Sequence, residues 1–143
     1  MNPIGKLFIA THVGLFRLTG GRIGASMFGG RVMVLTTTGS KTGKRRSVPV
    51  MYFEHDGSRF VVASYGGSPE HPAWFKNMRR NPDVTVEVPG RKYSARAEVI
   101  AGEERARVWQ QVTGEMSRFS DYEHKTQGKR EIPIVKLVEA QPS

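Results

Sequence analysis

"LTTTGSKTGKRRSVPVMYF", residues 35–53, is the stretch of this 143-residue chain that decides its fold. Two runs rich in β-branched residues, Arg31 to Thr38 and Arg46 to Glu54, flank a short turn, Gly39 to Gly43. Such runs favour strands, and a glycine-bounded turn between them predicts an antiparallel hairpin. Pro49 interrupts the second run, and because proline cannot donate to a ladder, we expect it at a sheet edge or a bulge.

Further strands follow this hairpin along the chain. The turn HDGS, His55 to Ser58, joins it to a third run, Arg59 to Ser64. Asp83 to Val88 and Lys92 to Ile100 alternate as a second hairpin, and Ile132 to Val138 is a last strand. Helical patterns mark three other segments: Pro3 to Leu18, Pro72 to Arg80 and Gly102 to Met116. Six strands and few helices predict a mainly β, α+β fold built as a small barrel.

The first 30 residues differ from the rest of the chain. Pro3 to Leu18 places apolar residues at helical spacing, flanked by Lys6 and Arg17, and the five glycines of Gly20 to Gly30 indicate a flexible link. We therefore predict an N-terminal helix and link over residues 1–30 and a barrel domain over residues 31–143. The helix can dock on the barrel or lie on an anionic membrane surface, and both interpretations stay open.

The charge of the chain is unevenly distributed. The net charge is +9, and no Asp or Glu occurs before Glu54. Eight cations stand in that first part: Lys6, Arg17, Arg22, Arg31, Lys41, Lys44, Arg45 and Arg46. Such asymmetry indicates an anionic partner, which can be a membrane surface, a nucleic acid or a phosphorylated ligand. The absence of cysteine excludes disulfides and thiolate sites and suits a reducing cytoplasm.

No self-sufficient catalytic motif is present. Gly39 and Gly43 are separated by three residues, and Lys44 is followed by arginine, so the basic turn is not a phosphate-binding P-loop. The chain has no G-x-G-x-x-G motif and no G-x-S-x-G elbow, and its four histidines stand singly, without metal-ligand spacing. An enzyme built this way needs a cofactor to carry the chemistry.

The basic turn is suited to anchoring such a cofactor. We expect backbone N–H groups of Gly39 to Gly43 to face an anion, and Lys41 and Arg46 to donate charge-assisted bonds to phosphate or carboxylate. Each such bond contributes about 1.5–3 kcal/mol. The stretch Val61 to Pro82 supplies the other half of a pocket, because the small residues after its strand permit close approach of a flat ring, next to Trp74.

Two ordered blocks carry a resemblance to a known family. They are LTTTGSKTGKRRSVPVMYF and VVASYGGSPEHPAWFKNMRRNPDVTVEV, and they are followed by EERARVW and REIPIVKL. From about Val32 to Glu139 the chain resembles the deazaflavin-dependent nitroreductase family. The resemblance implies a split β-barrel of the FMN-binding-like class, with about six antiparallel strands and with reduced coenzyme F420 as the hydride donor.

The resemblance also implies the residues of the site. The cofactor residues, in chain order, are Ser40, Lys41, Thr42 and Arg46 for the phosphate and oligoglutamate tail, Ser47, Val48, Pro49, Val50 and Met51 for the linker and ring, Val62, Ala63, Ser64 and Tyr65 for the ring edge, and Ala73, Trp74, Phe75, Lys76 and Asn77 for the opposite side. The basic turn would thus hold a tail that is a chain of negative charges.

The stretch MSRFSDYEHKTQ would form the acceptor side. The family often has three tyrosines there, whereas this chain has Met116, Phe119 and Tyr122. The resemblance therefore implies substrate contacts from all three residues and catalytic roles for Tyr122 and Ser64. It implies quinones, enones or activated nitro compounds as acceptors, and the loss of the middle hydroxyl argues against efficient nitroimidazole reduction.

Two rival functions stay open at this point. An FMN- or haem-binding protein of the same barrel class is the first, although one phosphate does not need four clustered cations. A nucleic-acid-binding module is the second, but aromatic residues are not interleaved with the basic turn as a stacking platform requires. We expect a cytoplasmic enzyme with a small-molecule acceptor, no nucleic-acid partner, and either a peripheral contact with the inner face of the membrane or none. The sequence leaves monomer and homodimer open.

Overall fold

The computed structural model of the protein describes the whole chain except residues 1–2, 28, 65–66, 68–69, 127–129 and 141–143. In chain order, the elements of the described residues are α1 Pro3–Leu18, β1 Ser26–Met27, β2 Gly30–Thr38, β3 Arg45–His55, β4 Ser58–Val62, α2 Ala73–Arg80, β5 Asp83–Val88, β6 Arg91–Val99, α3 Gly102–Glu115, α4 Arg118–Thr126 and β7 Ile134–Glu139. Six strands pair antiparallel in the order β2-β3-β4-β7-β6-β5, and β5 pairs back to β2. The predicted α+β fold with a six-stranded antiparallel barrel is therefore confirmed.

Strand β3 explains the proline in the first hairpin. Its residues 45–51 pair with β2, but only residues 52–55 pair with β4. Pro49 therefore lies where β3 has a strand neighbour on one side only, as its missing N–H requires. The unpaired side of this half-strand is the place where a ligand can approach the barrel.

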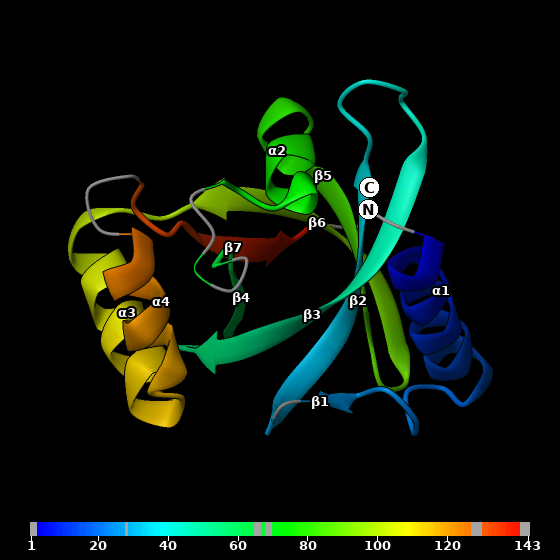
Figure 1. The fold of residues 1–143 in the computed structure, drawn as a ribbon, viewed down its shortest axis with the longest axis horizontal. Coiled ribbons are helices and arrows are strands. Elements are labelled where there is room, and N and C mark those ends of the chain that lie inside the picture. Colours follow the sequence, from blue (N-terminus) through cyan, green and yellow to red (C-terminus); the bar gives the residue numbers. More distant parts are fainter. Residues whose placement is uncertain (1–2, 28, 65–66, 68–69, 127–129, 141–143) are drawn as a thin grey trace.

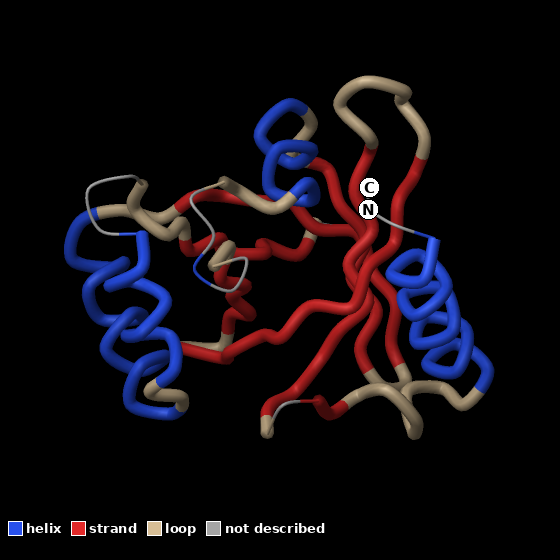
Figure 2. The backbone as a smooth tube through the Cα atoms, in the orientation of Figure 1, coloured by secondary structure: helices blue, strands red, loops and turns tan. Residues whose placement is uncertain are grey.

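The helices cover three different sides of the barrel. Figure 1 shows α1 on one side, α3 and α4 together on the opposite side, and α2 near the loop between β2 and β3. In Figure 2 this loop extends beyond the strands that flank it. Helix α4 was not predicted from the sequence, and it completes the pair of helices that faces the open half of β3.

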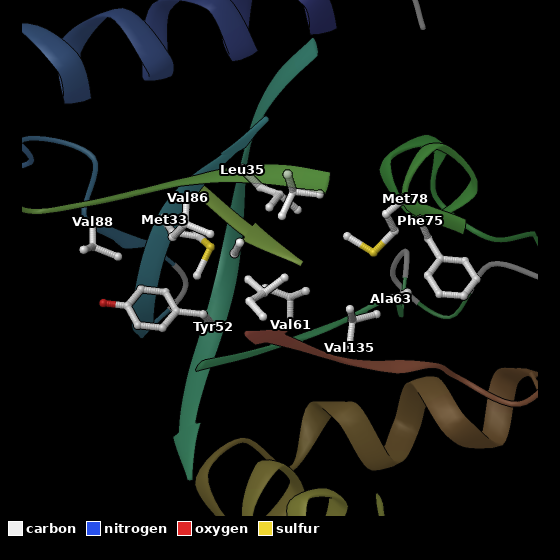
Figure 3. Close-up of a cluster of buried hydrophobic side chains, with 13 residues drawn as sticks. Met33, Leu35, Tyr52, Val61, Ala63, Phe75, Met78, Val86, Val88 and Val135 are labelled. Atoms are coloured by element: carbon white, nitrogen blue, oxygen red, sulfur yellow. The ribbon is translucent and has the colours of Figure 1, made fainter. Parts of the chain in front are cut away.

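The barrel interior is a continuous apolar core. Met33, Leu35 and Val61 of the strands are fully buried there. Figure 3 shows Phe75 and Met78 entering this core from α2. A second buried cluster joins β3, β4 and β7 to α3 and α4. Helix α2 is therefore held by the core, so the residues on its other face have a fixed position.

Helix α1 docks on the outside of the barrel. Val13 and Phe16 pack on Val34 of β2, and the Arg17 guanidinium lies 2.7 Å from the Glu87 carboxylate of β5. The Gly20 to Gly30 segment, which we expected to be a flexible link, contains the short strand β1, paired with β2. No helix of the described residues has the length and apolar character to cross a membrane.

Candidate active site

A cavity of about 440 Å³ lies between the open half of β3, the end of β4, the start of α2 and helix α4. Its volume falls in the range of small-molecule sites. Its described lining is Pro49, Val50, Met51, Val62, Ser64, Pro72, Trp74, Arg118, Phe119 and Tyr122. The structure thus brings together eight residues that the sequence assigned to cofactor or substrate, and adds Pro72 and Arg118.

The basic turn between β2 and β3 is exposed and carries uncompensated charge. Lys41, Lys44 and Arg46 take part in none of the ion pairs between described residues. Arg45 instead donates to the hydroxyls of Thr38 and Thr85, at 2.9 and 2.7 Å. Lys41, Lys44 and Arg46 can therefore bind an anion without first breaking an ion pair.

The backbone of this turn differs from the expectation. The Gly39 amide donates to the Lys44 carbonyl at 2.7 Å, and the Gly43 amide donates to the Gly39 carbonyl at 2.9 Å. The Ser40 amide donates to the side chain of Asn77 at 3.0 Å. The prediction that Gly39 to Gly43 present a row of N–H groups to an anion is wrong for these three, because the turn uses them to hold its own shape. Side chains must supply most of the anchor.

Asn77 connects the turn to α2. Its Oδ1 accepts from the Ser40 amide, and its Nδ2 donates to the Thr37 hydroxyl at 3.1 Å. Trp74 stands three residues earlier on the same helix and lines the cavity. Since residues three apart share a helix face and rise about 4.5 Å along the axis, the turn and the cavity adjoin. A ligand with a flat head and an acidic tail can span both.

Arg130 fixes the backbone directly after β4, and we call its two bonds there the Arg130 clamp. This guanidinium donates to the carbonyls of Ala63 and Ser64, at 2.9 and 2.7 Å. The Ala63 amide donates to the Pro133 carbonyl, so the backbone groups of Ala63 are committed within the fold. Ser64 is buried at the cavity wall, and no bond of its amide or hydroxyl occurs among the described residues. Ser64 is therefore the donor that this strand end can offer to a ligand.

His71 lies beside the same guanidinium. Its Nδ1 is 3.0 Å from Arg130, and its ring packs on Phe75 with centroids 4.8 Å apart. Burial, and then the positive charges of Arg130, Arg79 and Lys76, lower the pKa of His71 below its ordinary value of 6.5. A neutral His71 can accept a hydrogen bond from Arg130, which keeps the clamp on β4 intact at neutral pH.

The wall opposite the barrel consists of side chains from α4. Phe119 is buried, and its ring packs edge-on against Phe53 at 5.7 Å and against Tyr122 at 5.4 Å. Arg118 donates to the thioether sulfurs of Met51 and Met116, both at 3.3 Å. Met116 itself does not line the cavity, but its sulfur accepts a hydrogen bond from Arg118, which does.

Comparison with known proteins identifies the family of this chain. Residues 8–139 match the profile of the F420H2-dependent quinone reductase family. An F420H2-dependent quinone reductase of Mycobacterium tuberculosis is 33% identical over 138 residues, which cover 94% of this chain and 91% of the relative. The chain belongs to the F420H2-dependent quinone reductase family. It is an oxidoreductase, and coenzyme F420 is the cofactor of its family.

Solved structures agree with this family and with the split barrel. An F420-H2 dependent reductase is 36% identical with a TM-score of 0.66, and the match covers 74% of this chain and 92% of that one. A structure described as a domain-swapped dimer is 31% identical with a TM-score of 0.70, covering 95% and 99%. The predicted family and split-barrel fold are confirmed.

The residues of this family member fit a deazaflavin with an acidic tail. The cavity lining includes an aromatic side chain, Trp74, and a small residue, Ser64. The cationic turn is bonded to the same helix as Trp74, through the Ser40 amide and Asn77. Gly67 lets the loop after β4 approach α4, since a Cβ there would lie 3.2 Å from the Tyr122 Cα. No group of three or more His, Asp or Glu side chains within the described residues is placed to hold a metal ion.

Several predicted residues lie elsewhere. Ser47 faces α1, where its hydroxyl contacts Thr36 and Arg17, and Phe75 is in the barrel core. Ala63 is buried in the core with its backbone committed, and Tyr65 lies outside the described residues. The other predicted cofactor positions outside the cavity lining are Val48 of β3, Ala73, Lys76 and Asn77 of α2, and Ser40, Lys41, Thr42 and Arg46 of the basic turn region.

Sequence reasoning missed Arg118 and Arg130. Arg118 stands in MSRFSDYEHKTQ and Arg130 in REIPIVKL, two of the quoted stretches, but the resemblance gave neither residue a role. Arg130 could have been suspected only from its place before the closing strand, in REIPIVKL. Both become visible only when α4 and β7 are placed beside β4.

Proposed function

We propose that this protein reduces quinones and enones with hydride from reduced coenzyme F420, in the cavity between β3 and α4. The observation that carries the proposal is one cavity, with Trp74 and Ser64 on one side and Phe119 and Tyr122 on the other. Helix α2 connects this cavity to the exposed cationic turn, because Asn77 of the same helix bonds the Ser40 amide. Bound reduced deazaflavin supplies the hydride, and the protein supplies proximity and orientation.

In this proposal each group has a role that its surroundings support. Lys41 and Arg46 would bind the acidic tail, and Ser64 and Trp74, which line the cavity, would hold the ring, with Ser64 as a hydrogen-bond donor. Phe119 keeps water away from the acceptor, because it is buried and packs on Phe53. Tyr122, or water next to its hydroxyl, returns the proton that completes the reduced acceptor.

The test is oxidation of the reduced coenzyme by menadione in the presence of the protein. We expect turnover with menadione and with a cyclohexenone, and weak or no turnover with a nitroimidazole. Phe119→Tyr restores a hydroxyl at the middle position and should raise nitroimidazole reduction. Coenzyme binding without oxidation by any quinone or enone would contradict the proposal. Parallel titrations with FMN and haem test the rival cofactors, which we expect to bind more weakly.

We also propose that α1 makes a peripheral contact with the inner face of the membrane, in an otherwise cytoplasmic protein. Exposed apolar side chains run along the helix: Ile4, Leu7, Phe8, Leu15 and Leu18. Lys6 is exposed beside them, and anionic lipid complements its charge, whereas Arg17 at the other end of the helix is paired with Glu87. These side chains stay outside although Val13 and Phe16 of the same helix are buried on the barrel.

Co-sedimentation with vesicles that contain anionic lipid tests this contact. The intact protein should sediment with them, and Leu7→Ser with Phe8→Ser should stay in the supernatant. Val99→Ser is the matched control, because Val99 is an exposed apolar residue on β6. Equal sedimentation of all three proteins would contradict the membrane contact.

A further inference from the structure

Arg118 is the charged residue of the cavity. Among the described lining residues it is the one with a formal charge at neutral pH, and the lining next to it is aromatic or apolar, with Phe119 and Met51. It stands at the first position of α4 and is half-buried. A cation in such surroundings interacts with a ligand more strongly than one in bulk water, because the local dielectric constant is lower.

Two thioethers help to hold the Arg118 guanidinium at the cavity wall. The sulfurs of Met51 on β3, which lines the cavity, and Met116 after α3 each accept from its Nη2 at 3.3 Å. Thioether sulfurs are weak, uncharged acceptors, so these two bonds orient the guanidinium and do not themselves cancel its charge. Gly30 leaves room for this arrangement, since a Cβ there would overlap the terminal methyl groups of both methionines.

Arg118 lies on the side of the cavity where we expect the acceptor. Phe119 and Tyr122 belong to the same short helix and line the same cavity, whereas Trp74, Ser64 and the basic turn are on the barrel side. Arg118 and Tyr122 are four residues apart and therefore share one face of α4, so an acceptor that contacts Tyr122 lies beside the guanidinium. This position is at the opposite side of the cavity from the tail anchor.

We propose that Arg118 binds the acceptor's oxygen and stabilises the negative charge that reduction places on it. The inference rests on the proposed function and names the substrate class: acceptors with a carbonyl oxygen or an acidic substituent. A quinone that takes up a hydride gains two electrons and one proton, so one of its oxygens becomes an anion. A second proton, from Tyr122 or water, then gives the hydroquinone. Arginine stays protonated throughout and acts only as a hydrogen-bond donor.

Arg118 would then donate the hydrogen bond to the acceptor that a tyrosine hydroxyl at position 119 would otherwise donate. It would also select against cationic acceptors, because a like charge would be placed next to the guanidinium. The expected preference is naphthoquinone sulfonate over menadione, and menadione over a naphthoquinone with a quaternary ammonium group.

The experiment compares these three quinones with the intact protein and with Arg118→Gln, Arg118→Lys and Arg118→Met. A charge-assisted hydrogen bond predicts a loss of kcat/KM of about ten- to a hundredfold for menadione in Arg118→Gln. The loss should be larger for the sulfonate and absent or reversed for the ammonium compound. Arg118→Lys should restore part of the order of preference. Arg107→Gln is the matched control, since it removes the same charge from the exposed side of α3.

Two binding measurements separate this inference from the proposed function. Affinity for coenzyme F420 should change less than twofold in every Arg118 variant, and naphthoquinone sulfonate should quench tryptophan fluorescence less strongly in Arg118→Gln, with no coenzyme present. A protein that binds the sulfonate through Arg118 but oxidises no coenzyme would contradict the proposed function alone. An unchanged order of preference among the quinones, with unchanged sulfonate binding, would overturn the role of Arg118. A parallel loss of coenzyme affinity and melting temperature in all three variants would equally overturn it, since that pattern belongs to a structural residue.

Discussion

The two walls of the cavity are built in different ways. The barrel wall, which consists of Pro49, Val50, Val62 and Ser64, belongs to strands whose backbone is fixed by ladders and by the Arg130 clamp. The helical wall, which consists of Arg118, Phe119 and Tyr122, is held by side-chain packing on Phe53 and by two thioethers.

This difference determines which wall of the cavity tolerates side-chain substitutions and which does not. A side chain of the helical wall can be exchanged without loss of a backbone hydrogen bond, so acceptor choice can vary there. The barrel wall offers backbone and small residues, and a substitution there disturbs the sheet itself. If the coenzyme binds the barrel wall as proposed, the physical consequence would be a constant cofactor site on that wall and a variable acceptor site on the helical wall.

The largest expected effect comes from breaking the barrel wall. Arg130→Met leaves the carbonyls of Ala63 and Ser64 without their donor, and each unpaired buried group costs about 1–3 kcal/mol. We expect the melting temperature to fall by roughly 5–15 °C. Arg96→Met, at an exposed position on β6, should leave it nearly unchanged. A melting temperature within one or two degrees of the wild type would show that the clamp does not stabilise this wall.

The next effect concerns the tail anchor beside the barrel wall. Lys41→Ala with Arg46→Ala should weaken coenzyme F420 binding at least about tenfold, because two charge-assisted bonds are lost. The loss should be greater at low than at high salt, since both side chains are exposed. Fluorescence titration measures it. The control, Lys92→Ala with Arg96→Ala, removes the same charge from β6. An equal loss of coenzyme affinity in this control would show that net charge, and not a specific anchor at Lys41 and Arg46, is responsible.

The contact between the two walls can be tested at Gly67. This residue has a φ of +83°, and a Cβ would press on Tyr122 of α4. Gly67→Ala should cost roughly 1–2 kcal/mol in stability and lower kcat/KM for menadione several-fold, while coenzyme affinity stays the same. Gly57→Ala has a similar φ of +77° but open space around it. It should therefore cost stability without an effect on kcat/KM, and identical kinetics in both variants would contradict the predicted coupling.

The smallest effect is a pH dependence behind the barrel wall. Because folding lowers the pKa of His71 below 6.5, the unfolded chain binds its proton first as the pH falls. The stability contributed by neutral His71 is therefore present above pH 6.5 and is lost as the pH falls below that value. His71→Asn keeps an acceptor for Arg130 and should flatten the decline of the melting temperature between about pH 7.5 and pH 5.5. The control is His124→Asn, at an exposed position on α4, whose melting temperature should depend on pH as in the wild type. A wild-type pH dependence in His71→Asn would contradict the role given to His71.

The barrel could be predicted because its signals are local. Runs of β-branched residues and short glycine turns gave the bounds of β2, β5 and α1 to within one residue, and Pro49 indicated the edge of β3. Helix α4 could not be predicted, because RFSDYEHKT is short and mostly polar and follows α3 after a break of two residues. Its position depends on a buried cluster with Phe53 and Ile134, which is set by the tertiary fold.

The site was predictable to the same extent as its elements. Val50, Ser64 and Trp74 come from recognisable segments and line one cavity, and their contact with the cofactor stays a prediction. The turn amides were misjudged because the sequence does not show that Thr42, Lys44 and Asn77 bond within and across the turn. Arg118 could not be found, because its role follows from packing between α3, α4 and β3.

The methionine pair around Arg118 has a consequence for oxidative stress. A thioether accepts hydrogen bonds weakly, but a sulfoxide carries a strongly accepting oxygen. Oxidation of Met51 or Met116 would place that oxygen against the guanidinium at the mouth of the cavity. If Arg118 binds quinones as proposed, this oxidation would weaken quinone binding, and methionine sulfoxide reductase would restore it.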